Sequence, residues 1–185
     1  MLDEAMTAIA ENGLAALTMS ALADRLGTSG GHILYYFGSK DRLLLEALRW
    51  SEAALTEERR TLLAGRTAPA RKLDRFLQLY LPKGPRDPRW TLWLELWARA
   101  GSNEPLRTAQ DELDQGWRED LAALLAEGGA ADVFAVDDAA GRADELLALL
   151  DGLSTRVVLG QRGADRRGAL AAARSAARRL VGGPE

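Results

Sequence analysis

The segment from Thr18 to Lys40 limits the possible folds more than any other part of the chain, because its residue pattern predicts two short helices joined by a tight turn. Gly27 lies where the turn needs a residue that tolerates positive φ, and Ala23 is small enough to let the second helix approach the first. Apolar or aromatic residues stand at the other positions that such a pair buries: Leu22, Leu26, Ile33 and Tyr36. The segment therefore predicts a helix-turn-helix, whose second helix over residues 29–36 would lie in a DNA major groove.

The same segment resembles the DNA-binding signature of the TetR family of bacterial transcriptional regulators. The residues that match the family pattern at its fixed spacing are Ala23, Gly27, Ser29, Gly31, Ile33, Tyr36, Phe37, Lys40, Leu43 and Leu44. The rest of the chain resembles the family only in its helix layout. The resemblance implies an all-α fold of about nine helices, with a helix-turn-helix DNA-binding domain over residues 1–45 and an effector-binding and dimerisation domain over residues 46–185.

Several residues of this segment are candidates for DNA contact. The candidates on the second helix are Ser29, Gly30, Gly31, His32 and Tyr35. The two glycines allow close approach of the backbone to DNA, and His32 can contact a base edge or a phosphate, although a surface histidine often has no role. The resemblance also implies phosphate contacts for Thr18, Tyr36 and Lys40. For Lys40, a solvated surface side chain is the alternative.

The net charge of −3 is unexpected for a DNA-binding protein, because phosphate neutralisation supplies most of the affinity for DNA. Backbone N–H groups at helix N-termini and side-chain hydroxyls can also hold phosphates. Members of the family usually have a short, often basic arm before the first helix, whereas this sequence begins almost inside that helix. We expect either that the arm is absent or that the natural start differs from Met1.

The composition excludes several classes of site. The chain has no cysteine and a single histidine, His32, so it predicts no disulfide, no thiol catalysis, no metal site and no cofactor. The N-terminus lacks the basic lead and apolar run of a signal peptide, and no segment approaches the ~20 apolar residues of a membrane span. The sequence therefore predicts a soluble, cytoplasmic protein.

Aromatic residues in the second half form a candidate ligand site. Trp90, Trp93 and Trp97 repeat at steps of three and four residues within an expected helix over 88–100, a pattern that usually means core packing. The alternative is an apolar pocket with a few polar groups, and the resemblance implies that this domain binds a small-molecule effector, partly apolar or aromatic. The candidates for ligand contact are Phe76, Tyr80, Trp93, Trp97, Trp117 and Asp151.

The expected helix over residues 137–160 is apolar around much of its circumference and therefore needs two neighbours. One can come from its own chain and one from a second copy, which would give a four-helix bundle at the centre of a homodimer. A core within one chain is the alternative. The residues predicted to form the dimer interface are Leu146, Leu150, Leu153, Val157, Leu170 and Arg174.

The resemblance implies a ligand-responsive repressor that binds palindromic double-stranded operator DNA as a homodimer and is released by its effector. Two alternatives remain open. A protein-interaction module without DNA binding is supported only by the acidic first domain and the missing arm. An all-helical enzyme has little support, because the sequence offers no Ser/His/acid set, no phosphate-binding glycine loop and no metal-ligand spacing.

Overall fold

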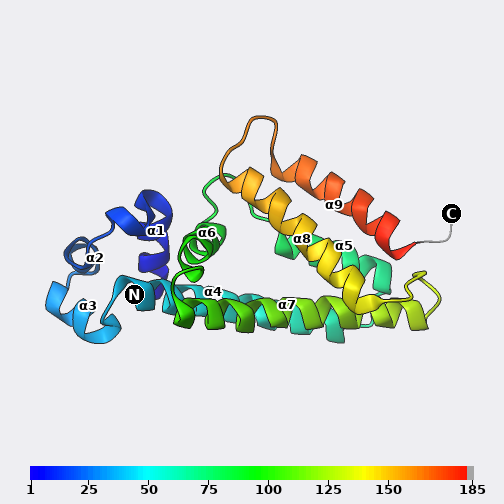
Figure 1. Cartoon of the computed structure of the whole chain (residues 1–185), viewed down its shortest axis with the longest axis horizontal. Coiled ribbons are helices and arrows are strands. Elements are labelled where there is room, and N and C mark those ends of the chain that lie inside the picture. Colours follow the sequence, from blue (N-terminus) through cyan, green and yellow to red (C-terminus); the bar gives the residue numbers. More distant parts are fainter. Residues whose placement is uncertain (183–185) are drawn as a thin grey trace. The chain divides into compact units, whose positions relative to one another are not determined.

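The computed structural model describes residues 1–182, and all regular secondary structure in that range is helical (Figure 1). The helices are α1 (Leu2–Ala16), α2 (Met19–Leu26), α3 (Gly30–Phe37), α4 (Lys40–Ala64), α5 (Pro69–Tyr80), α6 (Pro88–Ala100), α7 (Glu104–Ala130), α8 (Ala139–Val158) and α9 (Arg166–Val181). The predicted all-α fold is confirmed. None of the described helices is long and apolar enough to cross a membrane.

The chain divides into two compact units. The first comprises Met1–Ala54 and Arg86–Leu113, and the second comprises Leu55–Pro85 and Asp114–Glu185. Long helices contribute to both units, because the division falls inside α4 and inside α7. The functional boundary predicted between residues 45 and 46 remains a prediction.

The helix-turn-helix in the first unit is held by local hydrogen bonds that its sequence provides. The Thr18 hydroxyl accepts a hydrogen bond of 3.0 Å from the Ala21 N–H at the start of α2, and the Ser29 hydroxyl accepts one of 3.2 Å from the His32 N–H at the start of α3. Gly27 ends α2 in the left-handed conformation, with φ of 65°. These residues fix the turn between the two helices, which pack against each other.

The first helix is interrupted at Gly13, where the sequence predicts its end after Asn12. Gly13 leaves the helical conformation, with φ of 75° and ψ of 155°, and one further turn follows to Ala16. The Leu14 N–H after the kink donates a hydrogen bond of 2.9 Å to the Glu95 carboxylate on α6. This hydrogen bond joins α1 to α6, far apart in the sequence, immediately after the break at Gly13.

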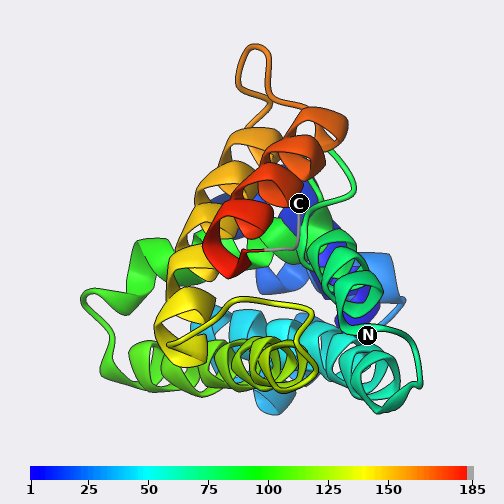
Figure 2. The same ribbon diagram turned by 90° about the vertical axis from the view of Figure 1, so that its right-hand side faces the viewer.

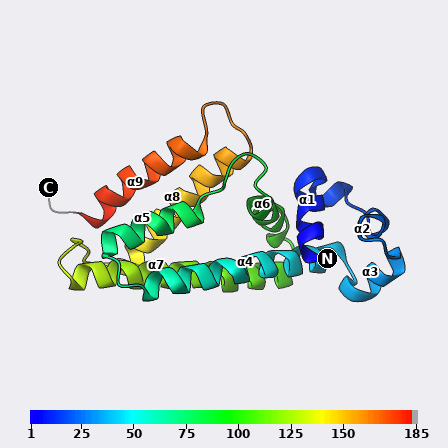
Figure 3. The same ribbon diagram turned by 180° about the vertical axis from the view of Figure 1, so that it is seen from behind.

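In the second unit α8 and α9 run antiparallel and side by side (Figures 1 and 2). Helix α5 lies along α9, as Figure 3 shows from behind. Two arginines join these helices. Arg166 donates to the carbonyls of Gln78 and Leu81 at 2.9 and 2.8 Å, near the C-terminal end of α5, and Arg174 pairs with Asp74 at 2.5 Å.

Candidate DNA-binding face and ligand site

Helix α3 exposes large side chains that a folded chain usually covers. Tyr35 is 87% exposed, Tyr36 61% and Leu34 52%. The rings of His32 and Tyr36 lie 5.7 Å apart. The expectation that Tyr36 is buried is wrong, because Phe37 and Ile33 occupy the core positions of this helix. The exposed group of aromatic and apolar residues favours an external partner for α3.

The two glycines of α3 have different environments. A Cβ atom on Gly30 would lie 3.2 Å from the Ser20 hydroxyl, so Gly30 allows α3 to approach α2 closely. A Cβ atom on Gly31 would meet only the Ser29 hydroxyl, at 3.9 Å. Gly31 is therefore the glycine whose backbone remains accessible to a partner.

Lys40 holds the end of α1. Its Nζ donates to the carbonyls of Leu14 and Ala15 at 3.3 and 2.9 Å, where a cation also complements the helix dipole. Sequence reasoning missed Arg42, which is exposed in the first turn of α4 and forms no ion pair among residues 1–182. By contrast, Arg25 is engaged by Glu4 and Glu11 at 2.6 and 2.5 Å.

In the second unit, the buried side chains of Phe76, Tyr80 and Arg59 meet around Trp117; we call these four residues, together with Asp151, the Trp117 cluster. The ring of Trp117 contacts the rings of Phe76 and Tyr80 edge-on, with centroid separations of 5.4 and 4.8 Å. The guanidinium carbon of Arg59 lies 3.8 Å from the centroid of the Trp117 ring. Phe76 is fully buried, and Trp117 is only 3% exposed.

Asp151 gives this cluster a negative charge. Its carboxylate accepts a hydrogen bond of 2.5 Å from the Tyr80 hydroxyl. Burial raises the pKa of Asp151 to about 6, although the hydrogen bond from Tyr80 lowers it, and the nearby charge of Asp114 raises it further. At neutral pH the carboxyl is therefore mainly ionised and short of positive charge, which favours a cation beside it.

The first unit holds a different aromatic group, which we call the Glu52 cluster. The Trp93 indole donates a hydrogen bond of 2.8 Å to Glu52, whose side chain Arg89 also approaches at 3.8 Å. The ring of Trp97 lies 6.0 Å from the rings of both Trp90 and Trp93. Glu52 is 2% exposed, and its charge is balanced by an arginine and an indole of its own chain.

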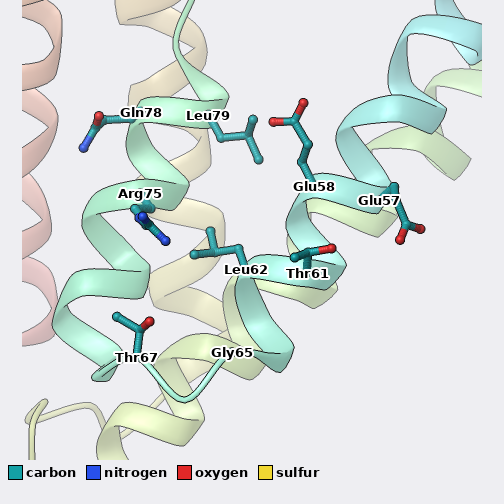
Figure 4. Close-up of a pocket in the computed structure, with 9 residues that line it drawn as sticks. All are labelled: Glu57, Glu58, Thr61, Leu62, Gly65, Thr67, Arg75, Gln78 and Leu79. Atoms are coloured by element: carbon teal, nitrogen blue, oxygen red, sulfur yellow. The ribbon is translucent and has the colours of Figure 1, made fainter.

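A surface groove also occurs in the second unit. Figure 4 shows side chains from α4, from α5 and from the turn between them around a volume of about 510 Å³. The lining residues are Glu57, Glu58, Thr61, Leu62, Gly65, Thr67, Arg75, Gln78 and Leu79. Because this lining contains no aromatic ring, the groove lacks the aromatic cage in which proteins bind quaternary ammonium cations.

Family comparisons agree with the geometry of α1 to α3. Residues 1–47 match the model of the family described as "Bacterial regulatory proteins, tetR family". Residues 69–182 match the model of the family described as "BetI-type transcriptional repressor, C-terminal". The chain belongs to the BetI-type branch of the TetR family. It is therefore a transcriptional repressor with a helix-turn-helix, as the resemblance implied, and not an enzyme.

Relatives of the repressor include the HTH-type transcriptional regulator BetI of Paraburkholderia phytofirmans, which is 30% identical over 176 residues, 92% of this chain and 86% of that protein. BetI of Agrobacterium fabrum is 29% identical over 84% of this chain and 74% of its own length. A transcriptional regulator from Saccharomonospora viridis, solved in complex with choline, is 30% identical with a TM-score of 0.87, covering 94% of this chain and 91% of that one.

The repressor's predicted ligand residues fall into two sets. Phe76, Tyr80, Trp117 and Asp151 come together in the second unit, whereas Trp93 and Trp97 belong to the Glu52 cluster of the first. Sequence reasoning missed Arg59 and Glu52. A signal was present, because both continue the apolar stripe of α4 at steps of four and three residues through Leu48, Leu55 and Leu62.

The predicted interface residues lie on α8 and α9 and differ in their exposure. Leu146 and Leu150 are fully buried and Val157 is 1% exposed, all within the repressor's own chain. Leu153 and Leu170 are half-buried, and Arg174 is paired with Asp74. Leu149 on α8 is 38% exposed, and Leu159, immediately after the end of α8, is 59% exposed. The interface itself stays a prediction.

Proposed function

We propose that this BetI-type repressor binds operator DNA as a homodimer and releases it when a quaternary ammonium cation such as choline binds at the Trp117 cluster. One observation carries the ligand part of the proposal: Asp151, largely buried and hydrogen-bonded to Tyr80, supplies negative charge beside a group of aromatic rings. The choline complex of the Saccharomonospora viridis relative supports the same ligand class.

Ligand chemistry agrees with this assignment. A quaternary ammonium has no N–H group, so a protein recognises it by aromatic ring faces and by a nearby negative charge rather than by hydrogen bonds to nitrogen. Trp117 and Tyr80 offer the rings, and Asp151 offers the charge. The Asp151 carboxylate can also accept a hydrogen bond from the hydroxyl of choline.

Release requires that ligand and DNA prefer different states of the protein. If choline binds better to the state that binds operator poorly, each ligand weakens the other by the same factor. Helix α4 provides a continuous element for this coupling, because only two residues separate it from α3 and it carries Arg59 in its second half. Phosphate contacts from α3 and from Arg42 would supply the affinity for DNA.

The test combines two titrations on the full-length protein. We expect fluorescence anisotropy to show binding to the palindrome nearest the gene, and choline to reverse it. Trp117→Leu should abolish the response to choline, whereas Trp50→Leu, which removes a tryptophan that is 46% exposed, should retain it. Failure to bind any such palindrome at low salt would leave a protein-interaction module as the better reading.

The homodimer part of the proposal rests on the faces that α8 and α9 expose. The exposed small and apolar side chains are Ala148, Leu149, Gly152, Ala171 and Ala172. If two copies of α8 pack antiparallel about an axis near Leu150, Glu145 lies close to Arg156 of the partner subunit. Such a dimer would present two copies of α3 to half-sites ~34 Å apart.

A charge exchange tests this arrangement. Glu145→Arg and Arg156→Glu should each weaken the dimer, because each places like charges together. The double variant should restore it. Analytical ultracentrifugation measures the dissociation constant, and a double variant no tighter than the single ones would contradict the antiparallel pairing.

A further inference from the structure

The Trp117 ring already carries a cation from its own chain. The guanidinium of Arg59 lies 3.8 Å from the ring centroid, which is contact distance for a cation on an aromatic face. This is the position that an ammonium group would take if it bound the same face. The following inference rests on the proposed function, because it concerns how the cation of the effector reaches Trp117.

Two nitrogen atoms of the Arg59 guanidinium donate hydrogen bonds, whereas the third has no acceptor among the described residues. Its Nε donates to Asp120 at 2.6 Å, and its Nη2 donates to the Thr56 hydroxyl at 3.3 Å. Arg59 is nevertheless only 2% exposed, and its Nη1 has no hydrogen-bond partner among the described residues. A buried guanidinium with an unmet N–H is costly, so its environment does not favour this position strongly.

We infer that Arg59 is a tethered competitor of the effector: it occupies the face of Trp117 in the free repressor, and the ammonium group of the ligand displaces it. Two cations cannot share one ring face at contact distance, because they overlap and repel. Asp120, whose side chain is 32% exposed, allows the exchange, because a displaced Arg59 can keep this partner as it turns toward solvent.

The exchange means that Arg59 sets the binding free energy that a cation must supply before it can occupy Trp117. Any cation must supply enough binding free energy to replace the arginine, so weakly binding cations leave the repressor unchanged. Arg59 lies on α4, so the exchange also changes the contacts of α4 with α7, which carries both Asp120 and Trp117. In this reading the arginine gives the second unit a defined ligand-free state.

Arg59→Met tests the inference in the full-length protein, because methionine removes the charge and fills much of the space. We expect choline to bind this variant about tenfold more tightly than it binds the wild type, the size of a cation–π contact. Arg60→Met is the matched control: its arginine is next in sequence, is 74% exposed at the side chain and pairs with Glu57. That variant should bind choline as the wild type does.

The outcomes separate this inference from the proposed function. Unchanged or weaker binding by Arg59→Met, with wild-type binding still dependent on Trp117, overturns the tethered competitor and leaves the ligand proposal in place. Binding of choline to neither protein overturns both. The neutral isostere 3,3-dimethyl-1-butanol should gain less than choline from Arg59→Met, and an equal gain would mean that the variant only created space.

A second measurement follows the exchange directly in the wild-type protein. In the ¹H–¹⁵N spectrum of the free repressor, the Arg59 Nε–H resonance should be shifted by the ring current of Trp117. Arg59→Lys assigns it. Saturation with choline should move this resonance to the position of solvent-exposed arginines. A resonance that stays in place while choline saturates its site overturns the inference.

Discussion

Each unit buries a carboxylate beside aromatic rings, but the two carboxylates differ in what balances them. Glu52 accepts a hydrogen bond from the Trp93 indole and faces Arg89, whereas Asp151 accepts one from the neutral Tyr80 hydroxyl and has Asp114 nearby. Glu52 therefore has both a hydrogen-bond donor and a positive charge from its own chain. Asp151 is short of positive charge, which is the condition that an external cation relieves.

The comparison teaches that residue type alone does not identify the ligand site. Trp93 and Trp97 have the same chemistry as Trp117, and the sequence placed all three in one candidate set. The electrostatic surroundings distinguish them: removal of a group from a balanced cluster should cost stability, whereas removal from an unbalanced cluster should cost ligand binding.

The largest expected effect follows from breaking the balanced cluster. Glu52→Ala leaves the Trp93 indole and Arg89 without their buried acceptor, so we expect the free energy of unfolding to fall by about 3–5 kcal/mol. Urea denaturation measures it. Glu46→Ala, on the same helix with a 45% exposed side chain, should change stability by less than about 0.5 kcal/mol. A loss of under about 1 kcal/mol for Glu52→Ala would refute a structural role.

The unbalanced cluster should respond in the opposite way. Asp151→Asn keeps an acceptor for Tyr80 but removes the charge, so we expect choline affinity to fall about 30-fold and stability at pH 7 to be maintained. Isothermal titration calorimetry measures the affinity. Asp144→Asn is the control, because its carboxylate lies on the same helix but is exposed and paired with Arg118. Equal affinities for the two variants would remove Asp151 from the site.

The pH dependence of choline binding sharpens the same contrast. With the pKa of Asp151 raised to about 6, the carboxyl is mainly ionised at pH 7 and mainly protonated at pH 5. Because the cation binds the ionised form, choline affinity should fall about tenfold between these two pH values. Binding to Asp151→Asn should be flat over the same range. A wild-type profile as flat as that of the variant would show that the charge of Asp151 does not act on the ligand.

Sequence reasoning succeeded where short-range chemistry decides the structure. Ser39, Asp87 and Asp138 cap their helices through side-chain oxygens, as serine and aspartate commonly do immediately before a helix. The helix-turn-helix is equally local, because Thr18, Gly27 and Ser29 act within four residues of their own positions. These elements could therefore be located without any tertiary information.

The ligand site depended on contacts that are distant in the sequence. Arg59 and Arg60 are adjacent and chemically identical, yet one is buried on Trp117 and the other is exposed, and only packing against α7 separates them. The wide apolar stripe of α8 was recognised, but Leu150 turns toward its own chain while Leu149 remains exposed. A stripe indicates how much surface needs covering and not which neighbour covers it.

The smaller of the two effects on stability concerns the weaker of the two groups around Glu52. Arg89 approaches the buried carboxylate only to 3.8 Å, and the Trp93 indole still bonds Glu52 without it, so Arg89→Met should lower the free energy of unfolding by about 2 kcal/mol, below the loss for Glu52→Ala. Arg71→Met, an exposed change on α5, is the control and should be neutral. The ranking matters because it separates charge balance from hydrogen bonding. If Arg89→Met leaves the free energy of unfolding unchanged, the arginine does not balance Glu52, and charge balance is then not what distinguishes Glu52 from Asp151.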